Sequence, residues 1–310
     1  MYTVYKKQVG VDCVEAVKVK SRAKINLTLD VLYRREDGFH ELEMVMQSLK
    51  LYDSIAVQKT AQAGVFLQTD VPFLPTDERN LAYRAARKMQ EAFALPGGVQ
   101  ICLTKRIPVA AGLAGGSGNA AAVLAAMNEL YELQLSLKEL MKLGLTLGSD
   151  VPYCLFGKTA LAKGRGEILE ELPDCPHFYV VLAKPDFGVS TGAVFRALQA
   201  EKIGRHPDTA GMLRAIEAKD RAGICARLEN VLEPVTFQMQ PQVQKIKGFL
   251  AAQGAEGVLM SGSGPTIFAL FTQKEAAEEA CQKTKEAFAR STVLVTETVD
   301  KGEQGYGLSL

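Results

Sequence analysis

The sequence predicts an α+β protein built from two domains. Its 310 residues are enough for two domains of ordinary size, each with its own hydrophobic core. Segments with strand periodicity and segments with helix periodicity alternate along the chain. The pattern of residues changes around residues 173–176. We therefore expect an N-terminal domain over residues 1–174 and a C-terminal domain over residues 175–310, the second one a small sandwich of helices and strands.

The elements of the first domain follow from periodicity and turn signals. Residues 1–15 are weakly patterned and are expected to form a frayed extension. Alternation over residues 17–31 predicts one or two strands, and Asp37-Gly38 predicts a hairpin tip before a strand over 43–51. The other expected elements are a helix over 77–93 that stops at Gly97-Gly98, a strand over 99–103, a helix to about 131, a helix opened by a Ser136–Glu139 capping box and ending near Gly148, and a hairpin over 159–167.

Strands and helices continue to alternate in the second domain. The expected strands cover residues 178–183, 257–260, 266–271 and 292–299, and the expected helices cover 190–198, 208–218, 241–253 and 274–289. A second glycine-containing block, Ser261-Gly-Ser-Gly-Pro265, separates two of these strands. The tail from Asp300 is polar and is expected to be mobile.

The stretch from Pro108 to Gly118 is the strongest indication of function. It carries four glycines in seven residues and leads into an alanine-rich run, which favours a helix. A flexible loop at a helix N-terminus offers unpaired N–H groups and the positive end of the helix dipole to an anion, most naturally a phosphate. No Gly-Lys-Ser/Thr follows and the spacing is not Gly-x-Gly-x-x-Gly, so a Walker P-loop and a dinucleotide fingerprint are excluded. The alternative is a turn that only packs the helix.

Composition limits the class of protein. Apolar residues make up 47% and charged residues 23%, as in ordinary globular proteins, and the net charge of +1 gives no footprint for nucleic acid or an anionic membrane. No apolar run approaches the roughly 18–20 residues of a membrane span, and the start lacks the apolar core of a signal peptide. The six cysteines show no Cys-x-x-Cys spacing, which is typical of a reducing compartment. We expect a cytoplasmic protein.

Polar residues in three places are candidates for a site. Lys24 and Asn26 share one face of the predicted first strand, as a polar site requires, although a strand lysine is often a solvated edge charge. His40 stands beside Phe39 on a loop, and an aromatic face with an adjacent donor suits a nucleobase, although a lone histidine is often structural. Asp150 follows a predicted helix end, where its spacing leaves both a structural cap and a functional carboxylate open.

Three blocks of the chain resemble the GHMP kinases, a family of small-metabolite kinases. These are Ala23-Lys-Ile-Asn-Leu27, the loop Pro-x-x-x-Gly-Leu-x-Gly-Gly-Ser from Pro108, and the block Ser261–Pro265, in that order over nearly the whole chain. Two more stretches, Arg35–Leu42 and Leu147–Pro152, are similar to the branch of the family whose acceptor is a polyol joined to cytidine diphosphate. The similarity continues through Lys184-Pro185 and Gly188–Thr191.

The resemblance implies a fold, a reaction and a set of site residues. The fold would be the two-domain GHMP kinase fold, with an N-terminal domain like domain 2 of ribosomal protein S5 and a ferredoxin-like α/β sandwich at the C-terminus. The reaction would be phosphoryl transfer from ATP, with Mg²⁺, to the 2-hydroxyl of a methylerythritol unit in non-mevalonate isoprenoid biosynthesis. The chain would be a monomer or weak homodimer with a small-molecule substrate and no nucleic-acid or membrane partner.

The implied roles fall on seventeen positions of this sequence. Asp150 would be the general base, and Lys24 would orient it and stabilise charge on the transferring group. Asn26, Phe39 and His40 would bind the cytidine end, with Phe195 on the other face of the base, and no residue is assigned as a metal ligand. The ATP phosphates would be held by Pro108, Val109, Ala110, Ala111, Gly112, Leu113, Ala114, Gly115, Gly116, Ser117 and Gly118.

The chain departs from the family pattern at two positions. Phe39 stands where relatives usually carry tyrosine, and Gly118 stands where a second serine usually follows Ser117. The missing hydroxyl puts direct Mg²⁺ ligation by the loop in doubt. We still expect the Gly118 N–H to contact phosphate and a Gly118→Ser variant to keep or improve activity. The alternatives are a GHMP kinase for mevalonate or homoserine, disfavoured by the Phe39-His40 pair, and a non-catalytic nucleotide and metabolite sensor, disfavoured by Lys24 with Asp150.

Overall fold

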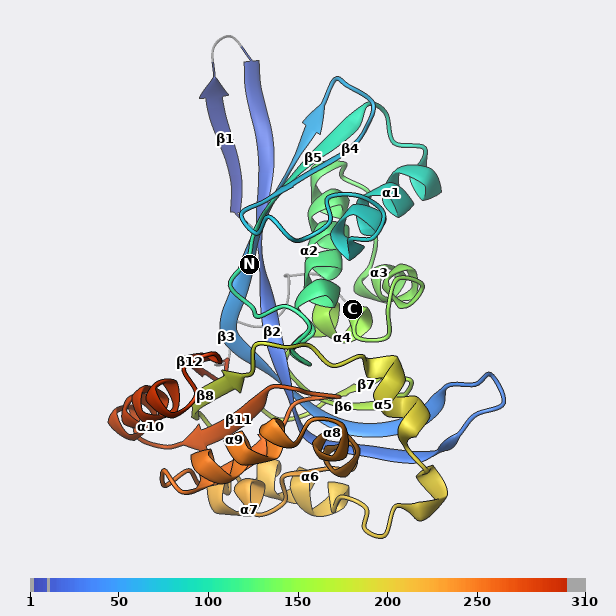
Figure 1. Cartoon of the computed structure of the whole chain (residues 1–310). Helices are drawn as coiled ribbons and strands as arrows, with labels where there is room; N and C mark the ends of the chain where they lie inside the picture. Colours follow the sequence, from blue (N-terminus) through green and yellow to red (C-terminus); the bar gives the residue numbers. More distant parts are fainter. Residues whose placement is uncertain (1–2, 10–11, 300–310) are drawn as a thin grey trace.

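The structure, a computed structural model, describes residues 3–9 and 12–299. These residues form two sheets with helices packed on them (Figure 1). The elements of the first half are β1 (Thr3–Val9), β2 (Asp12–Arg34), β3 (His40–Thr60), β4 (Gly64–Thr69), α1 (Leu81–Phe93), β5 (Gly98–Thr104), α2 (Gly115–Leu130), α3 (Leu137–Leu145), α4 (Val151–Phe156), β6 (Thr159–Gly164) and β7 (Ile168–Glu171).

The second half starts with the strand β8. Its elements are β8 (Tyr179–Lys184), α5 (Thr191–Ala197), a 3₁₀ turn (Ala200–Lys202), α6 (Thr209–Glu217), α7 (Arg221–Cys225), β9 (Glu229–Asn230), α8 (Glu233–Met239), α9 (Pro241–Ala251), β10 (Gly257–Met260), β11 (Ile267–Phe271), α10 (Lys274–Ala287) and β12 (Thr292–Glu297). Four of these strands form an antiparallel sheet in the order β10-β11-β8-β12, on which α9 and α10 pack.

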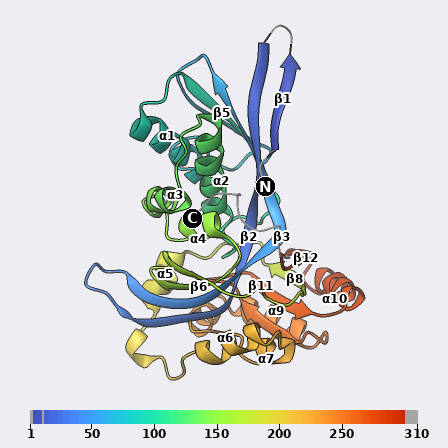
Figure 2. The ribbon, with the colours of Figure 1, turned by 180° about the vertical axis from the view of Figure 1, so that it is seen from behind.

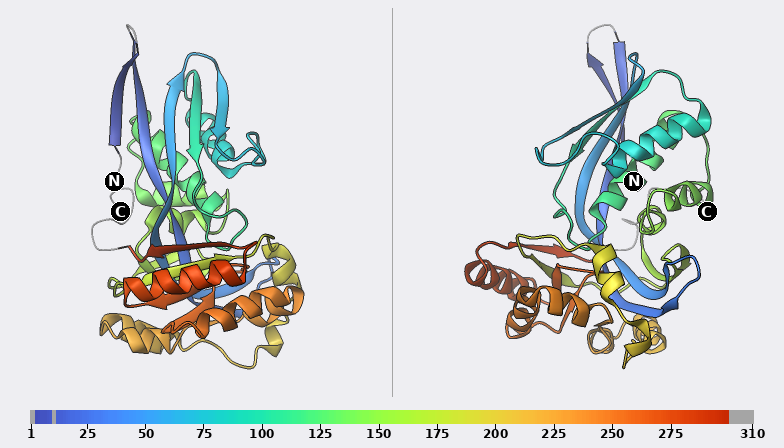
Figure 3. Two further views of the ribbon diagram at one scale, coloured as in Figure 1. Left: turned by 60° about the vertical axis from the view of Figure 1, so that its left-hand side comes forward. Right: turned by 45° about the vertical axis from the view of Figure 1, so that its right-hand side comes forward.

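The larger sheet is built on the long antiparallel pair of β2 and β3. Its main order is β1-β2-β3-β5-β4, with β6 paired to β3 and β7, and β9 paired to β2. The pair runs from the upper into the lower part of the molecule, where its hairpin end projects near α5 (Figures 1 and 3). The view from behind shows α5 and the hairpin end on the same side of the molecule (Figure 2). One strand pair therefore connects the two halves.

Irregular pairing lets β2 contribute to two hydrophobic cores. Val19 belongs to the first core, Ile25 to the second, and Leu29 to the first again, although all three have odd numbers. The register against β3 shifts between Arg22 and Lys24 and again between Asn26 and Thr28. Such irregularities re-aim side chains because regular strands alternate with period two. The strand segment between the two shifts is the one that carries Lys24.

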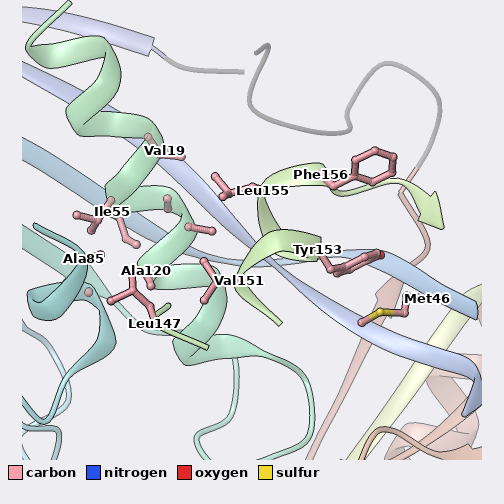
Figure 4. Packing of buried hydrophobic residues seen from close by; sticks show 14 of the residues in the cluster. Val19, Met46, Ile55, Ala85, Ala120, Leu147, Val151, Tyr153, Leu155 and Phe156 are labelled. Atoms are coloured by element: carbon pink, nitrogen blue, oxygen red, sulfur yellow. The ribbon is translucent and has the colours of Figure 1, made fainter. Parts of the chain in front are cut away.

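The helix α2 forms the centre of the first core. Nearly all of its residues from Gly118 to Leu130 are buried, and small alanines let the surrounding elements approach closely. Around Ala120, side chains from β2, β3, α1 and α4 meet (Figure 4). This burial fixes the N-terminus of α2, which is where the glycine loop ends.

Most predicted elements are present, but some expectations were wrong. Residues 3–9 are not frayed, because β1 pairs with β2 from Thr3↔Lys18 to Val9↔Asp12. The helix expected from residue 77 begins at Leu81, where Asn80 accepts a hydrogen bond from the Ala82 N–H. It ends at Phe93, as expected, and its C-cap is Ala94 in the left-handed region.

Other differences concern short elements and the chain end. The elements β4, α4, α7, β9 and α8 were not expected from the sequence, because they are short or lack clear periodicity. The capping box of Ser136 and Glu139 is confirmed at the start of α3, although that helix ends at Leu145. The tail from Asp300 lies outside the described residues. Within them, no helix combines the length and apolar character that crossing a membrane requires.

Candidate active site

A cleft of about 670 Å³ lies where the hairpin of β2 and β3 meets α5, the start of α2 and the start of α4. It brings together residues from both halves of the chain. The residues that line it are Lys24, Asn26, Leu29, Arg34, Gly38, Phe39, His40, Leu42, Met44, Gly112, Ser117, Ser149, Asp150, Arg165, Thr191, Gly192, Phe195, Arg196, Leu198, Leu232, Gly262 and Ser263.

Lys24 and Asp150 form an ion pair at this cleft. The Lys24 ammonium lies 3.8 Å from Asp150 Oδ2 and donates a 2.8 Å hydrogen bond to Asn26 Oδ1. Lys24 is 4% exposed, so the strand places it inside the protein and not at a solvated edge. The Asp150 side chain is 37% exposed and makes no capping hydrogen bond to α4. The structural cap considered for Asp150 is therefore not its role in this fold.

Asn26 is held by its neighbours. It is fully buried, its side-chain oxygen accepts from Lys24, and its amide nitrogen donates to Met44 Sδ at 3.4 Å. Because one end of the amide is already bonded to the ammonium, Asn26 orients Lys24 as well as lining the cleft.

The glycine loop has an unusual backbone and a helix start without a side-chain cap. Ala110 and Ala114 have φ of 51° and 56°, in the left-handed region that non-glycine residues seldom adopt. Ala114 is the N-cap of α2, and no side chain accepts from the first N–H groups of that helix. The N–H groups of Gly115, Gly116 and Ser117 precede the first intrahelical donor, so they are available to an anion.

Contacts from elsewhere in the chain fix the loop. The Lys24 N–H donates to the Leu113 carbonyl at 3.2 Å, and the Ser261 hydroxyl donates to the Gly112 carbonyl at 3.0 Å. Gly112 has φ of +73°, and a side chain there would overlap the Ser261 carbonyl. Gly262 also lies close to the site, since a Cβ on this residue would stand 3.4 Å from Lys24 Nζ. The two glycine blocks, far apart in sequence, are thus packed against each other beside Lys24.

Only part of the loop faces the cleft. Gly112 and Ser117 line it, whereas Ala111 and Leu113 are buried in the second hydrophobic core. The expectation that the Gly118 N–H contacts a phosphate was wrong. Its N–H donates to the Ala114 carbonyl at 2.8 Å inside the first turn of α2, so it is not free for a phosphate. The residue is buried, and the other loop residues, Pro108, Val109, Ala110, Ala114, Gly115 and Gly116, do not line the cleft.

Aromatic residues and arginines surround the far end of the cleft. The Arg165 guanidinium lies 3.6 Å from the centroid of the Phe39 ring, which is 47% exposed. The rings of His40 and Phe195 stack with centroids 5.2 Å apart and an interplanar angle of 30°. Phe195 therefore contacts His40. In this structure the rings of Phe39 and Phe195 do not face each other across a space for one base, although this had been expected. Burial, and then the Arg34 charge, lower the pKa of His40, so its ring is neutral near pH 7.

Several lining residues escaped the sequence analysis. Arg165 was seen only as part of a turn-rich hairpin, although two glycines with φ of +72° and +109° flank it and shape that turn. Its Nε is buried without a hydrogen-bond partner, which is costly unless a ligand accepts from it. Arg34 and Arg196 also line the cleft, and the Thr191 and Ser263 hydroxyls lie 2.8 Å apart in its wall. Thr191 and Ser263 belong to the resemblance blocks Gly188–Thr191 and Ser261–Pro265, but no local pattern indicated that they would meet.

The donor set bears on the metal that kinases of this kind use. Within residues 3–9 and 12–299, no group of three or more histidine, cysteine or carboxylate side chains is placed to hold an ion. Mg²⁺ is commonly bound by one or two carboxylates together with substrate phosphates and water. One carboxylate, Asp150, shares the cleft with Ser117 at the loop, so these residues fit a metal carried on the phosphates.

Two family models and several named proteins are similar to this chain. The model of the GHMP kinases N terminal domain matches residues 80–158, and that of the GHMP kinases C terminal matches residues 212–290. The chain is similar to 4-diphosphocytidyl-2-C-methyl-D-erythritol kinase of Geobacillus kaustophilus (strain HTA426), with 51% identity over 82% of this chain and 88% of that protein. The enzyme of the same name from Lachnoclostridium phytofermentans is 45% identical over 87% of this chain and 93% of that protein.

A solved structure shows the same likeness over most of the chain. A crystal structure of 4-(cytidine 5'-diphospho)-2C-methyl-D-erythritol kinase superposes with a TM-score of 0.77 and 37% identity, covering 91% of this chain and all of that one. The two-domain α+β fold expected from the sequence is thereby confirmed. From the matching family models, the relatives and the fold together, the chain belongs to the GHMP kinase family.

Proposed function

We propose that the protein is an ATP-dependent kinase that phosphorylates the 2-hydroxyl of 4-diphosphocytidyl-2-C-methyl-D-erythritol in non-mevalonate isoprenoid biosynthesis. The relatives that share about half of its residues carry the name of this enzyme. The observation that carries the proposal is the buried Lys24 ammonium beside the half-exposed Asp150 carboxylate in a cleft next to an uncapped helix N-terminus.

In the reaction, Asp150 acts as the general base. Its carboxylate takes the proton of the acceptor hydroxyl as the hydroxyl oxygen forms a bond to the γ-phosphorus of ATP. The bond from that phosphorus to the bridging oxygen breaks, and ADP leaves. Lys24 orients the carboxylate and stabilises the negative charge on the transferring group, and Asn26 holds the Lys24 side chain in place.

The ATP phosphates bind at the start of α2. The N–H groups of Gly115, Gly116 and Ser117 have the direction and the partial positive charge that phosphate oxygens need. Glycine at 115 and 116 lets the phosphates approach the backbone closely. Asp150 and Ser117 would hold Mg²⁺ together with the phosphates, and the ion would neutralise the phosphate charge.

The far end of the cleft binds the cytidine diphosphate part of the acceptor. Phe39 offers a half-exposed ring to the base, and His40 and Phe195 supply a second stacked pair beside it. Three arginines, Arg34, Arg165 and Arg196, line the cleft together with one carboxylate, that of Asp150. The excess of positive charge suits an acceptor that carries a diphosphate. Mevalonate and homoserine carry no diphosphate for these arginines. We propose that the protein acts in the cytoplasm as a monomer or weak homodimer.

The proposal is tested by ADP release from purified protein with ATP, Mg²⁺ and 4-diphosphocytidyl-methylerythritol, compared with the same mixture without acceptor. Acceptor-dependent release is expected. Release only with mevalonate or homoserine would assign the same fold to a different acceptor. Binding of ATP without release for any of the three acceptors would favour the nucleotide sensor.

A further inference from the structure

A buried carboxylate outside the cleft holds the entrance and the exit of the glycine loop. Asp53 of β3 is fully buried. Its Oδ1 accepts from the Arg106 and Ile107 N–H groups at 2.7 and 2.8 Å, directly before the loop begins at Pro108. Its Oδ2 accepts from the Asn119 side chain at 2.8 Å, directly after the loop ends at Gly118.

A lysine completes this cluster beneath the loop. The Lys105 ammonium forms an ion pair with Asp53 Oδ2 and donates to Asn119 Oδ1 at 3.2 Å. It also lies 3.2 Å from the point where a Cβ on Gly115 would stand, so the cluster reaches the first turn of α2. The Asn119 amide donates in addition to Ser21 of β2 at 3.2 Å. Both oxygens of Asp53 are therefore fully used by donors that belong to the two ends of the loop.

The loop between these ends needs such a constraint. Ala110 and Ala114 are in the left-handed region, which is strained for a residue that carries a Cβ. Such conformations persist only when the surrounding structure determines them. A buried ion pair is in itself weak evidence for stability, because apolar residues of similar volume are often as stable. Its position at both ends of a strained loop points to a different use.

We propose that Asp53 is a positioning residue for ATP: with Lys105 and Asn119 it holds the entrance and the exit of the loop at the spacing in which the N–H groups of α2 meet the ATP phosphates. This rests on the function proposed above. Asp53 itself does not line the cleft and does not touch the reacting atoms. It acts on ATP affinity through the loop, and the acceptor site is left unchanged.

The test uses the full chain with Asp53→Asn and Asn119→Ala. Asp53→Asn keeps the shape and the Oδ1 acceptor but places an NH₂ against Lys105 and Asn119. Asn119→Ala keeps the buried ion pair and removes the hydrogen bonds that join the loop exit to Asp53, Lys105 and Ser21. Because a displaced N–H group loses its hydrogen bond to a charged phosphate oxygen, we expect the dissociation constant of ATP to rise at least about tenfold in both variants. The KM for the acceptor should change by less than about twofold.

Asp30→Asn is the matched control. Asp30 is also a buried carboxylate, on the neighbouring strand, but it accepts from the Val31 N–H and pairs with His206, away from the loop. The Asp30→Asn substitution should lower the melting temperature without changing ATP affinity. The measurements are ATP binding by isothermal titration, KM for each substrate, and thermal melting of each variant.

The outcomes separate this inference from the proposed function. If the unchanged chain binds ATP and phosphorylates its acceptor, but both loop variants bind ATP as tightly as it does, Asp53 and Asn119 only stabilise the fold and the inference is wrong. A rise in acceptor KM equal to the rise for ATP would also overturn it. If the unchanged chain does not bind ATP, the proposed function fails and the inference fails with it.

Discussion

The Lys24 ammonium lies 3.8 Å from the Asp150 carboxylate, although one residue belongs to β2 and the other precedes α4. Lys24 is nearly enclosed, whereas Asp150 reaches the cleft with more than a third of its side chain exposed. The pair thus joins a rigid buried cation to an accessible carboxylate. That arrangement suits proton transfer from a bound hydroxyl, because the base is open to the acceptor and its orientation is set from behind.

Removing the base should abolish turnover without unfolding the protein. Asp150→Asn preserves shape but accepts no proton, so kcat should fall by about 10²–10⁴-fold, the usual contribution of a general base. The melting temperature should change little, since the Asp150 side chain is partly exposed and makes no capping bond. Turnover that stays within tenfold of the unchanged chain would exclude Asp150 as the base.

Arg165 should determine affinity for the acceptor. Arg165→Met keeps much of the side-chain volume on the Phe39 ring but removes the buried, unpartnered Nε. We expect the KM for the acceptor to rise about tenfold or more, as for loss of a charge-assisted hydrogen bond, with the KM for ATP unchanged. Arg79→Met, at an exposed arginine paired with Asp77, is the control and should change neither constant. An unchanged acceptor KM in Arg165→Met would remove the arginine from the site.

Gly118→Ser should destabilise the protein, whereas the sequence alone led us to expect only that its activity is kept or improved. A Cβ on Gly118 would stand 2.6 Å from Ser21 Oγ, in a buried part of the first turn of α2. Overpacking of this kind costs about 1–3 kcal/mol in the free energy of unfolding.

A second substitution tests whether Ser21 is the cause. The next atom near that Cβ is the Arg22 carbonyl at 3.4 Å, an ordinary contact. Adding Ser21→Ala should therefore recover most of the loss in denaturant unfolding. A double variant no more stable than Gly118→Ser alone would mean that the helix turn itself rejects a side chain.

The stability of the protein should decrease as the pH falls below about 6.5, in part through His40. Burial and the Arg34 charge lower the pKa of His40 in the folded state. Between the unfolded-state and the folded-state pKa of His40, the unfolded chain binds a proton that the folded chain does not. The free energy of unfolding therefore falls as the pH decreases through this range and levels off below the folded-state pKa. His40→Gln should flatten this part of the curve of unfolding free energy against pH. An identical slope in the variant would show that other groups produce it.

The sequence by itself determined most of the secondary structure and the chemistry of the loop. Periodicity located α2, α9, α10 and the strands of the second sheet, and the capping box located the start of α3, because these signals are local. The motif blocks were enough to indicate the GHMP kinase fold, which the comparisons confirm. The hairpin containing β1 was missed because its strands lack a clear alternation.

Only the tertiary structure decided which residues meet. Register shifts in β2 turn Lys24 inward, and no pattern in the sequence announces a shift of pairing. Arg165, Thr191 and Ser263 come from separate parts of the chain. Ser21 of β2 fills the space beside Gly118 of α2, so a glycine fits at that position. Contacts of this kind depend on the packing of distant segments. Local periodicity reports which face of an element is buried, but not which side chain of another element it is buried against.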